Sequence, residues 1–213
     1  MMSVYLSGIM KRSFDFMLAA VGLIFSMPLW CIIGIAIIFD DGLPVFYVQE
    51  RVGKDNILFP GMKFRSMIID AEKGVGPVQA IENDPRVTRV GKLLRKTAMD
   101  ELPQLINIIR GDMSFVGPRA LRPTEIEVVT PVDKDDSSSE LFKSRHRIKP
   151  GLTGVAQVYA PRDLPRQEKL KYDLWYINNR TFLLDISLIL QSFWITFNKK
   201  WDTADRNFRK KIV

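Results

Sequence analysis

Asp100 and Glu101 form an acidic pair in a stretch otherwise crowded with arginine and lysine. Apolar residues at helical spacing follow the pair and stop at Gly111, so we expect a helix that begins at Asp100 as its N-cap. Free backbone N–H groups and the neighbouring Arg95 should then lower the pKa of Asp100 and keep it ionised. An ionised carboxylate can attack phosphorus and form an acyl phosphate. The commoner alternative is that Asp100 only caps the helix and Glu101 is a solvated acid.

Basic side chains at turns and at the ends of predicted elements favour phosphate chemistry at the acidic pair over a purely capping role for Asp100. Each one alone is typical of a solvated surface charge, but together they could converge on the same phosphate groups. Attack on a diphosphate also needs its charge masked, which Mg²⁺ bridging Asp100 and the diphosphate would do. The candidate basic residues are Lys63, Arg65, Arg95, Arg119, Arg145 and Arg147.

Composition excludes several classes of protein. Cys31 and His146 are the only residues of their types, so neither an intramolecular disulfide nor a multi-histidine metal site can form. No Walker A loop or dinucleotide-binding glycine fingerprint is present. The net charge of +7 favours anionic partners such as phosphates and acidic lipid headgroups. We expect no nucleic-acid partner, because the aromatic and basic pattern of the common RNA-binding folds is missing.

Residues 16–39 form an uncharged apolar run that is long enough to span a bilayer. Lys11 and Arg12 precede the run, and a straight span would keep them in the cytoplasm and export the phosphate-binding part. Pro28 offers another topology, since it should kink the helix, and the Ser26 hydroxyl could satisfy a carbonyl that Pro28 leaves free. We therefore predict a re-entrant helix–break–helix over residues 12–39. The alternatives are a straight span and a buried helix.

The rest of the chain, residues 40–213, is predicted to form one cytoplasmic catalytic part within a single domain. Short strands are expected at residues 45–48, 62–64 and 155–159. Helices are expected after the start signal at 83–85, after Asp100, and at 169–178 and 182–201. The last of these is either an interfacial amphipathic helix or a final core helix. The fold class is α+β, mainly helical with a small β element.

Seven segments in this order are similar to the bacterial monotopic phosphoglycosyl transferases, in their minimal catalytic form. These sugar transferases begin the assembly of lipid-linked glycans. The resemblance covers most of the chain, from about residue 11 to residue 195. The segments that carry it are residues 11–15, 49–53, 63–67, 83–88, 94–104, 111–119 and 145–154.

The resemblance implies a reaction and a set of roles. A sugar-1-phosphate would pass from a UDP-sugar to a polyprenol phosphate, typically undecaprenyl phosphate, with release of UMP. Asp100 would be the nucleophile that carries a covalent phosphosugar, and Glu101 would assist metal binding or proton handling. Mg²⁺ would be the cofactor. Phosphates would be held by Arg95 and Arg119, and with less support from the motif by Lys63, Arg65 and Arg145.

The resemblance also implies a cellular setting. The protein would lie in the bacterial cytoplasmic membrane with its catalytic part on the cytoplasmic face. It would contact membrane lipid, hand its product to downstream glycosyltransferases, and could form a homodimer. The family usually breaks its membrane helix at Ser-Pro, whereas Met27 precedes Pro28 here. Two other functions remain open from the residues alone: a membrane-anchored scaffold that binds acidic lipid without catalysis, and a lipid phosphatase.

Overall fold

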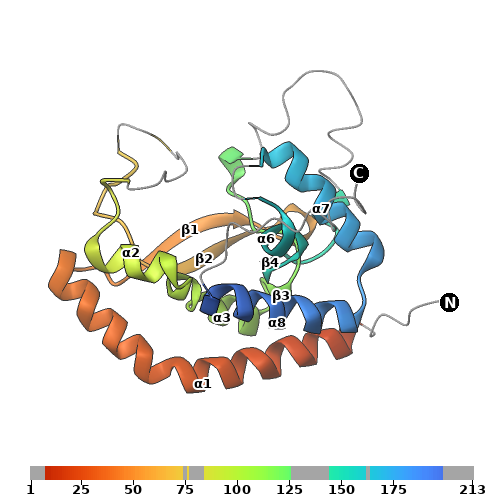
Figure 1. Ribbon diagram of the computed structural model, residues 1–213, viewed down its shortest axis with the longest axis horizontal. Helices are drawn as coiled ribbons and strands as arrows, with labels where there is room; N and C mark the ends of the chain where they lie inside the picture. Colours follow the sequence, from red (N-terminus) through yellow and green to blue (C-terminus); the bar gives the residue numbers. More distant parts are fainter. Residues whose placement is uncertain (1–7, 74–75, 77–83, 126–143, 162–163, 199–213) are drawn as a thin grey trace.

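The apolar run forms a single helix, α1 (Gly8–Asp41). The computed structural model describes residues 8–73, 76, 84–125, 144–161 and 164–198. By length and composition, α1 is the one helix among these residues that could cross a membrane. It bends near its middle and runs along one edge of the rest of the protein (Figure 1). The helix continues through Pro28, so the predicted break does not interrupt it, because proline removes only one backbone hydrogen bond.

The Ser26 hydroxyl does not act as predicted. The missing N–H of Pro28 frees the carbonyl of Ile24, four residues earlier. Ser26 instead donates to the carbonyl of Leu23 (3.2 Å) and accepts a hydrogen bond from the Trp30 indole (3.0 Å). Its hydroxyl thus joins two neighbouring turns of α1 at the level of the proline.

Two small sheets form the β element. Strands β1 (Phe46–Val52) and β2 (Leu58–Phe64) are antiparallel, with Tyr47 opposite Lys63, and the short 3₁₀ helix η1 (Lys54–Asn56) lies in the turn between them. Strands β3 (Ser114–Val116) and β4 (Gly151–Thr153) are parallel. The first sheet confirms the strands expected at residues 45–48 and 62–64, although both are longer than predicted.

Two short helices lie between the sheets in the sequence. Helix α2 (Arg89–Lys96) leads through the 3₁₀ turn η2 (Met99–Glu101) into α3 (Gln104–Arg110), which ends at Gly111 with a positive φ of 97°. The start signal at 83–85 was misplaced: Thr88 caps α2 by accepting the Gly91 N–H. The Asp84 carboxylate instead pairs with Arg86, and Asn83 lies outside the described residues.

Three helices complete the described chain: α6 (Val155–Tyr159), α7 (Arg166–Asn179) and α8 (Phe182–Asn198). The strand predicted at 155–159 is wrong. Val155 and Val158, three positions apart, are both buried, as expected for one face of a helical turn. The predictions of helices at 169–178 and 182–201 are confirmed as far as residue 198, since the last residues of the second lie outside the described chain.

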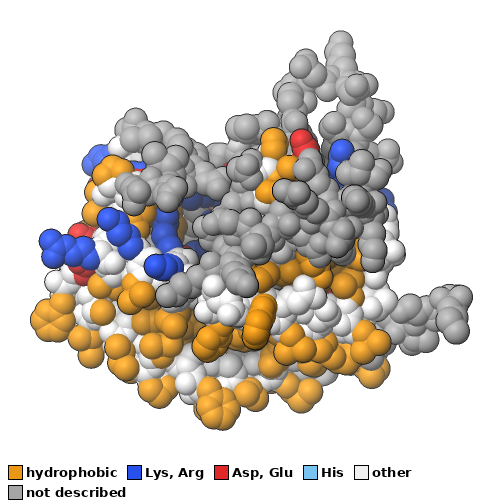
Figure 2. All heavy atoms as spheres, in the orientation of Figure 1, with side chains coloured by type: hydrophobic (Ala, Val, Ile, Leu, Met, Phe, Trp, Pro, Cys, Tyr) orange, Lys and Arg blue, Asp and Glu red, His pale blue; other side chains and the backbone are white. Residues whose placement is uncertain are grey.

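The main core is enclosed by α1, α3, the β3–β4 sheet and the C-terminal helices. Tyr176, Ile108 and Leu188 are among its largest fully buried members. A smaller cluster joins α1 to β2 and α2 through Ile33, Ile37, Phe64 and Leu94. Helix α8 buries Leu188 on one side and exposes several large apolar side chains on the other. Figure 2 shows hydrophobic side chains gathered along the edge that α1 and α8 form. Those exposed on α8 are Leu183, Leu190, Phe193, Trp194 and Phe197.

Both ends of α1 are fastened to this body. At its start, Arg12 donates to the last carbonyls of α3, and Lys11 forms ion pairs with Asp15 and with Asp185 of α8, each 2.9 Å. At its end, the Asp40 carboxylate accepts the Val90 N–H of α2 (2.8 Å). The helix therefore begins and ends against the same folded unit.

Candidate active site

The acidic pair lies in the turn η2, between α2 and α3. Ala98 adopts a left-handed conformation (φ 53°), which reverses the chain after α2 and turns Asp100 inward, where it is 9% exposed. Pro103, not Asp100, is the residue before α3, and no side chain caps that helix. The predicted capping role of Asp100 is therefore wrong. The prediction that the pair precedes an apolar helix stopped by Gly111 is confirmed.

Glu101 is the ionised member of the pair. Its Oε1 atom accepts a hydrogen bond from the Lys63 ammonium (2.6 Å) and another from the Arg119 guanidinium (3.0 Å). Burial alone would raise the pKa of Glu101, but the two cations outweigh it and lower that pKa to about 2. Glu101 therefore holds Lys63 and Arg119 together, and at neutral pH it carries a full negative charge.

Asp100 behaves in the opposite way. Its burial raises its pKa, and the negative charge of Glu101 raises it further, against the lowering effects of Lys63 and Arg95. The predicted fall in the pKa of Asp100 is therefore wrong, because burial outweighs the helix end and the neighbouring cations. No described residue donates a hydrogen bond to the Asp100 carboxylate. Of the two acids, Asp100 is the more basic and the less engaged.

Three of the six candidate basic residues lie around the pair. Lys63 and Arg119 contact Glu101, and the positive charge of Arg95 acts on Asp100 while its Nε donates to the Ser66 hydroxyl (2.9 Å). These cations come from β2, α2 and the segment after β3, which are far apart in the sequence. The fold thus gathers positive charge around two carboxylates.

Arg65 and Arg145 do not join the site. The guanidinium of Arg65 is buried and donates to the carbonyls of Asp41, Gly42 and Leu43, so it closes the C-terminal end of α1. Arg145 is buried in an ion pair with Asp173 of α7 (2.8 Å).

Arg145 also donates to the backbone carbonyl of Arg119. We therefore reinterpret Arg145 as a residue that positions Arg119 rather than a phosphate ligand. Its partner Asp173 has a pKa raised by burial, which the charge of Arg145 opposes. Arg147 is exposed.

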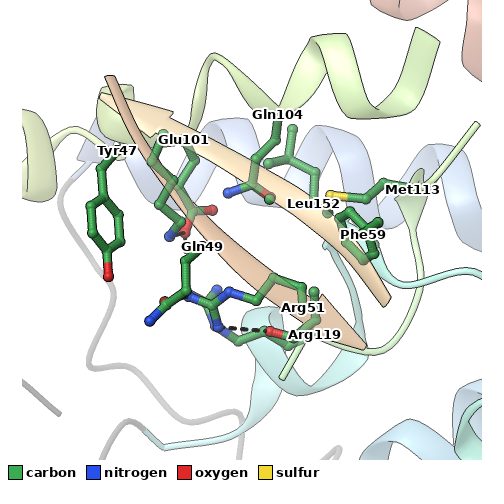
Figure 3. Close-up of a pocket in the computed structure, with 13 residues that line it drawn as sticks. Tyr47, Gln49, Arg51, Phe59, Glu101, Gln104, Met113, Arg119 and Leu152 are labelled. Atoms are coloured by element: carbon green, nitrogen blue, oxygen red, sulfur yellow. Dashed lines mark hydrogen bonds and ion pairs between the residues drawn. The ribbon is translucent and has the colours of Figure 1, made fainter. Parts of the chain in front are cut away.

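A pocket opens beside Glu101, and strand β1 supplies one wall of it. Tyr47, Gln49 and Arg51 line it together with Lys63 and Arg119 (Figure 3). Burial, with the nearby charge of Arg119, lowers the pKa of Arg51 to about 10. Residues 49–53 belong to a motif of the family resemblance for which no role was predicted. Alternation along a strand would have put Tyr47, Gln49 and Arg51 on one face.

Asp100 lies just outside the lining of this pocket, one residue beyond Glu101. A substrate in the pocket would therefore meet Lys63, Glu101 and Arg119 first. The Asp100 carboxylate accepts no hydrogen bond from the described residues, so no such bond would have to break for it to turn towards the pocket.

The described residues hold no cluster of three or more acidic, histidine or cysteine side chains that could cage a metal. Mg²⁺ is commonly held by one or two carboxylates together with water and substrate phosphates. Asp100, which has an unengaged carboxylate near the charges of Lys63, Arg95 and Arg119, fits that donor set. Glu101 fits it less well, because Lys63 and Arg119 already occupy its Oε1 atom.

The sequence model of the bacterial sugar transferases matches residues 6–199. This chain belongs to that family. It is 36% identical to the exopolysaccharide production protein ExoY of Rhizobium meliloti over 204 residues, which cover 88% of this chain and 85% of that protein. It is 37% identical to the UDP-glucose:undecaprenyl-phosphate glucose-1-phosphate transferase of Escherichia coli, over 92% of this chain and 42% of that protein.

A third relative of this bacterial sugar transferase is the undecaprenyl-phosphate galactose phosphotransferase of Salmonella typhimurium. The two are 35% identical over 87% of this chain and 40% of that protein. The family and these relatives make the chain an enzyme, a phosphoglycosyl transferase associated with the membrane. They decide against the non-catalytic scaffold that the sequence had left open.

Proposed function

We propose that this phosphoglycosyl transferase moves a sugar-1-phosphate from a UDP-sugar to a polyprenyl phosphate such as undecaprenyl phosphate, with Asp100 as the nucleophile. The choice of Asp100 as the nucleophile rests on one observation. Among the described residues, Glu101 accepts hydrogen bonds from two cations, whereas the neighbouring Asp100 accepts none. A basic carboxylate with free lone pairs is the better nucleophile, and the ion-paired one is suited to holding cations in place.

In the first half of the reaction, an Asp100 carboxylate oxygen attacks the phosphorus that bears the sugar. The bond from that phosphorus to the bridging oxygen breaks, and UMP leaves with the electron pair. The product on the enzyme is an acyl phosphate that still carries the sugar. Lys63 and Arg119, fixed by Glu101, offset the charge that builds up on the phosphate oxygens.

In the second half, a phosphate oxygen of the polyprenyl phosphate attacks the same phosphorus. The bond to the Asp100 oxygen breaks, which restores the carboxylate and yields the polyprenyl diphosphate sugar. Mg²⁺ held by Asp100 and the diphosphate, with Glu101 as a further candidate ligand, would neutralise phosphate charge. Relatives act in exopolysaccharide production, so the lipid-linked sugar would begin a surface glycan that downstream glycosyltransferases extend.

The membrane topology that we propose is re-entrant, with both ends of α1 on the cytoplasmic face. The ion pair of Lys11 with Asp185 and the hydrogen bond from Val90 to Asp40 support it, since both ends of the helix contact the catalytic body. If α1 spanned the bilayer, its two ends would lie on opposite sides of the membrane, and they could not both contact the same catalytic body. The exposed apolar edge of α1 and α8 would lie in the lipid.

Cysteine labelling tests this topology. In a Cys31→Ser background, we expect single cysteines at Ser3→Cys and Lys73→Cys both to react with a membrane-impermeant maleimide only in inverted vesicles. Intact spheroplasts, which expose the outer face, should protect both positions. Labelling of one position from each side would replace the re-entrant helix with a span.

Product analysis tests the transfer itself. Purified protein with Mg²⁺, a short polyprenyl phosphate and a panel of UDP-sugars should release UMP with at least one donor. Inorganic phosphate released in place of UMP would favour the lipid phosphatase. Release of neither product from any donor would reject the proposed reaction.

A further inference from the structure

One face of strand β1 lines the pocket but takes no part in the transfer steps. Tyr47, Gln49 and Arg51 alternate along the strand and therefore share a face. Figure 3 shows the Gln49 side chain between those of Tyr47 and Arg51. Tyr47 lies opposite Lys63, which contacts Glu101, and Gln49 lies one strand repeat further away, about 6–7 Å along β1. A ligand whose diphosphate sits at Lys63 can thus extend its other end over Gln49.

The amide of Gln49 is held in one orientation. Its Oε1 atom accepts a hydrogen bond from the Arg51 guanidinium (2.9 Å), and Arg51 also donates to the Ala120 carbonyl (3.2 Å). Because a guanidinium can only donate, the amide oxygen must face Arg51 and the Nε2 group must face away from it. None of the described residues accepts a hydrogen bond from Nε2. Gln49 therefore presents donors, and no acceptor, to a ligand in the pocket.

The opposite strand leaves room for this arrangement. Gly61 faces Gln49 across the sheet. A Cβ atom on Gly61 would lie 2.8 Å from Cγ of Arg51 and 3.3 Å from the backbone carbonyl oxygen of Gln49. The lack of a side chain at Gly61 allows Arg51 to lie against the sheet and hold Gln49. Next to Gln49, the Tyr47 side chain is 40% exposed and offers an aromatic face.

We propose that this face of β1 reads the nucleobase of the donor and selects uracil over cytosine. The Gln49 Nε2 group donates to a uracil carbonyl oxygen, and the Tyr47 ring contacts the base. Cytosine carries an amino group where uracil carries O4, so two donors would face each other and both would lose a partner. This inference rests on the proposed UDP-sugar donor and adds the residues that recognise its base.

Nucleotide binding to the full-length protein in nanodiscs, with Mg²⁺, tests this proposal. Isothermal titration calorimetry should give a wild-type affinity for UDP about tenfold above that for CDP, the order expected for one hydrogen bond against an unpaired donor. Gln49→Leu should lose this preference while its affinity for pyrophosphate stays unchanged. Gln49→Glu replaces the donor with an acceptor that suits the cytosine amino group, and should shift the preference towards CDP.

The matched control is Glu50→Gln, an exposed position on the opposite face of the same strand, which should keep the wild-type preference. If the wild type prefers UDP and Gln49→Leu keeps that preference, Gln49 does not recognise the base. This result would leave the proposed transfer reaction intact. A wild-type protein that binds neither nucleotide better than pyrophosphate would contradict both the base reading and the UDP-sugar donor. Thermal unfolding of each variant identifies any loss of binding that comes from misfolding.

Discussion

Asp100→Asn is expected to abolish sugar-phosphate transfer and to leave the protein folded. An amide cannot attack phosphorus, and removal of a covalent nucleophile costs activity on the order of 10⁴-fold or more. The measurement is UMP release with Mg²⁺ and the best donor from the panel. Asp70→Asn, an exposed acid paired with Lys73, serves as the matched control and should keep wild-type activity.

The stability of the Asp100→Asn variant separates a chemical role from a structural one. The folded-state pKa of Asp100 is raised, so above that pKa its ionised form makes folding less favourable. The neutral amide removes this cost, and the unfolding temperature at pH 7 should equal or exceed that of the wild type. An inactive variant with a much lower unfolding temperature would point to a structural role, and an active variant would reject Asp100 as the nucleophile.

Lys11→Met is expected to produce the largest loss of stability. Lys11 is 9% exposed and forms ion pairs with Asp15 and Asp185, which are 3% and 0% exposed. Its removal leaves two buried acids facing each other, and breaking a buried pair in this way costs about 3–5 kcal/mol. The unfolding midpoint in a fixed detergent measures the effect.

Two further variants sharpen that test. Lys54→Met removes a lysine whose ion pair with Asp55 is largely exposed, and it should change stability by about 1 kcal/mol or less. Lys11→Met combined with Asp185→Asn should recover part of the loss, because the amide can still accept the Tyr176 hydroxyl that now donates to Asp185 (2.7 Å). If Lys11→Met unfolds at the wild-type midpoint, this network does not fasten α1 to α8.

The sequence correctly predicted those elements that depend only on residues close together in the chain. The stop of α3 at Gly111 and the β1–β2 pair follow from residue types and spacing, and the structure has both. Residues 155–159 were misread because five mostly apolar residues fit a strand and a helical turn equally well. Strand β4, which lies just before them in the sequence, forms the parallel pair with β3 instead.

The roles of the arginines could not be read from the sequence. Arg65 and Arg145 occupy motifs much like those of Lys63 and Arg119, but their partners are distant in the chain: the end of α1 for Arg65 and Asp173 for Arg145. The same limit explains the pKa of Asp100. The lowered pKa was predicted from neighbours along the chain, whereas burial, the largest contribution to the pKa of Asp100, depends on the fold.

The covalent role of Asp100 is best tested by mass spectrometry of the intact protein, mixed with UDP-sugar and Mg²⁺ in the absence of any lipid acceptor. We expect a mass increase equal to one sugar phosphate, localised to Asp100 by peptide mapping and absent from the Asp100→Asn variant. An adduct on another residue, or transfer that proceeds with no adduct on Asp100 at any time after mixing, would contradict this role.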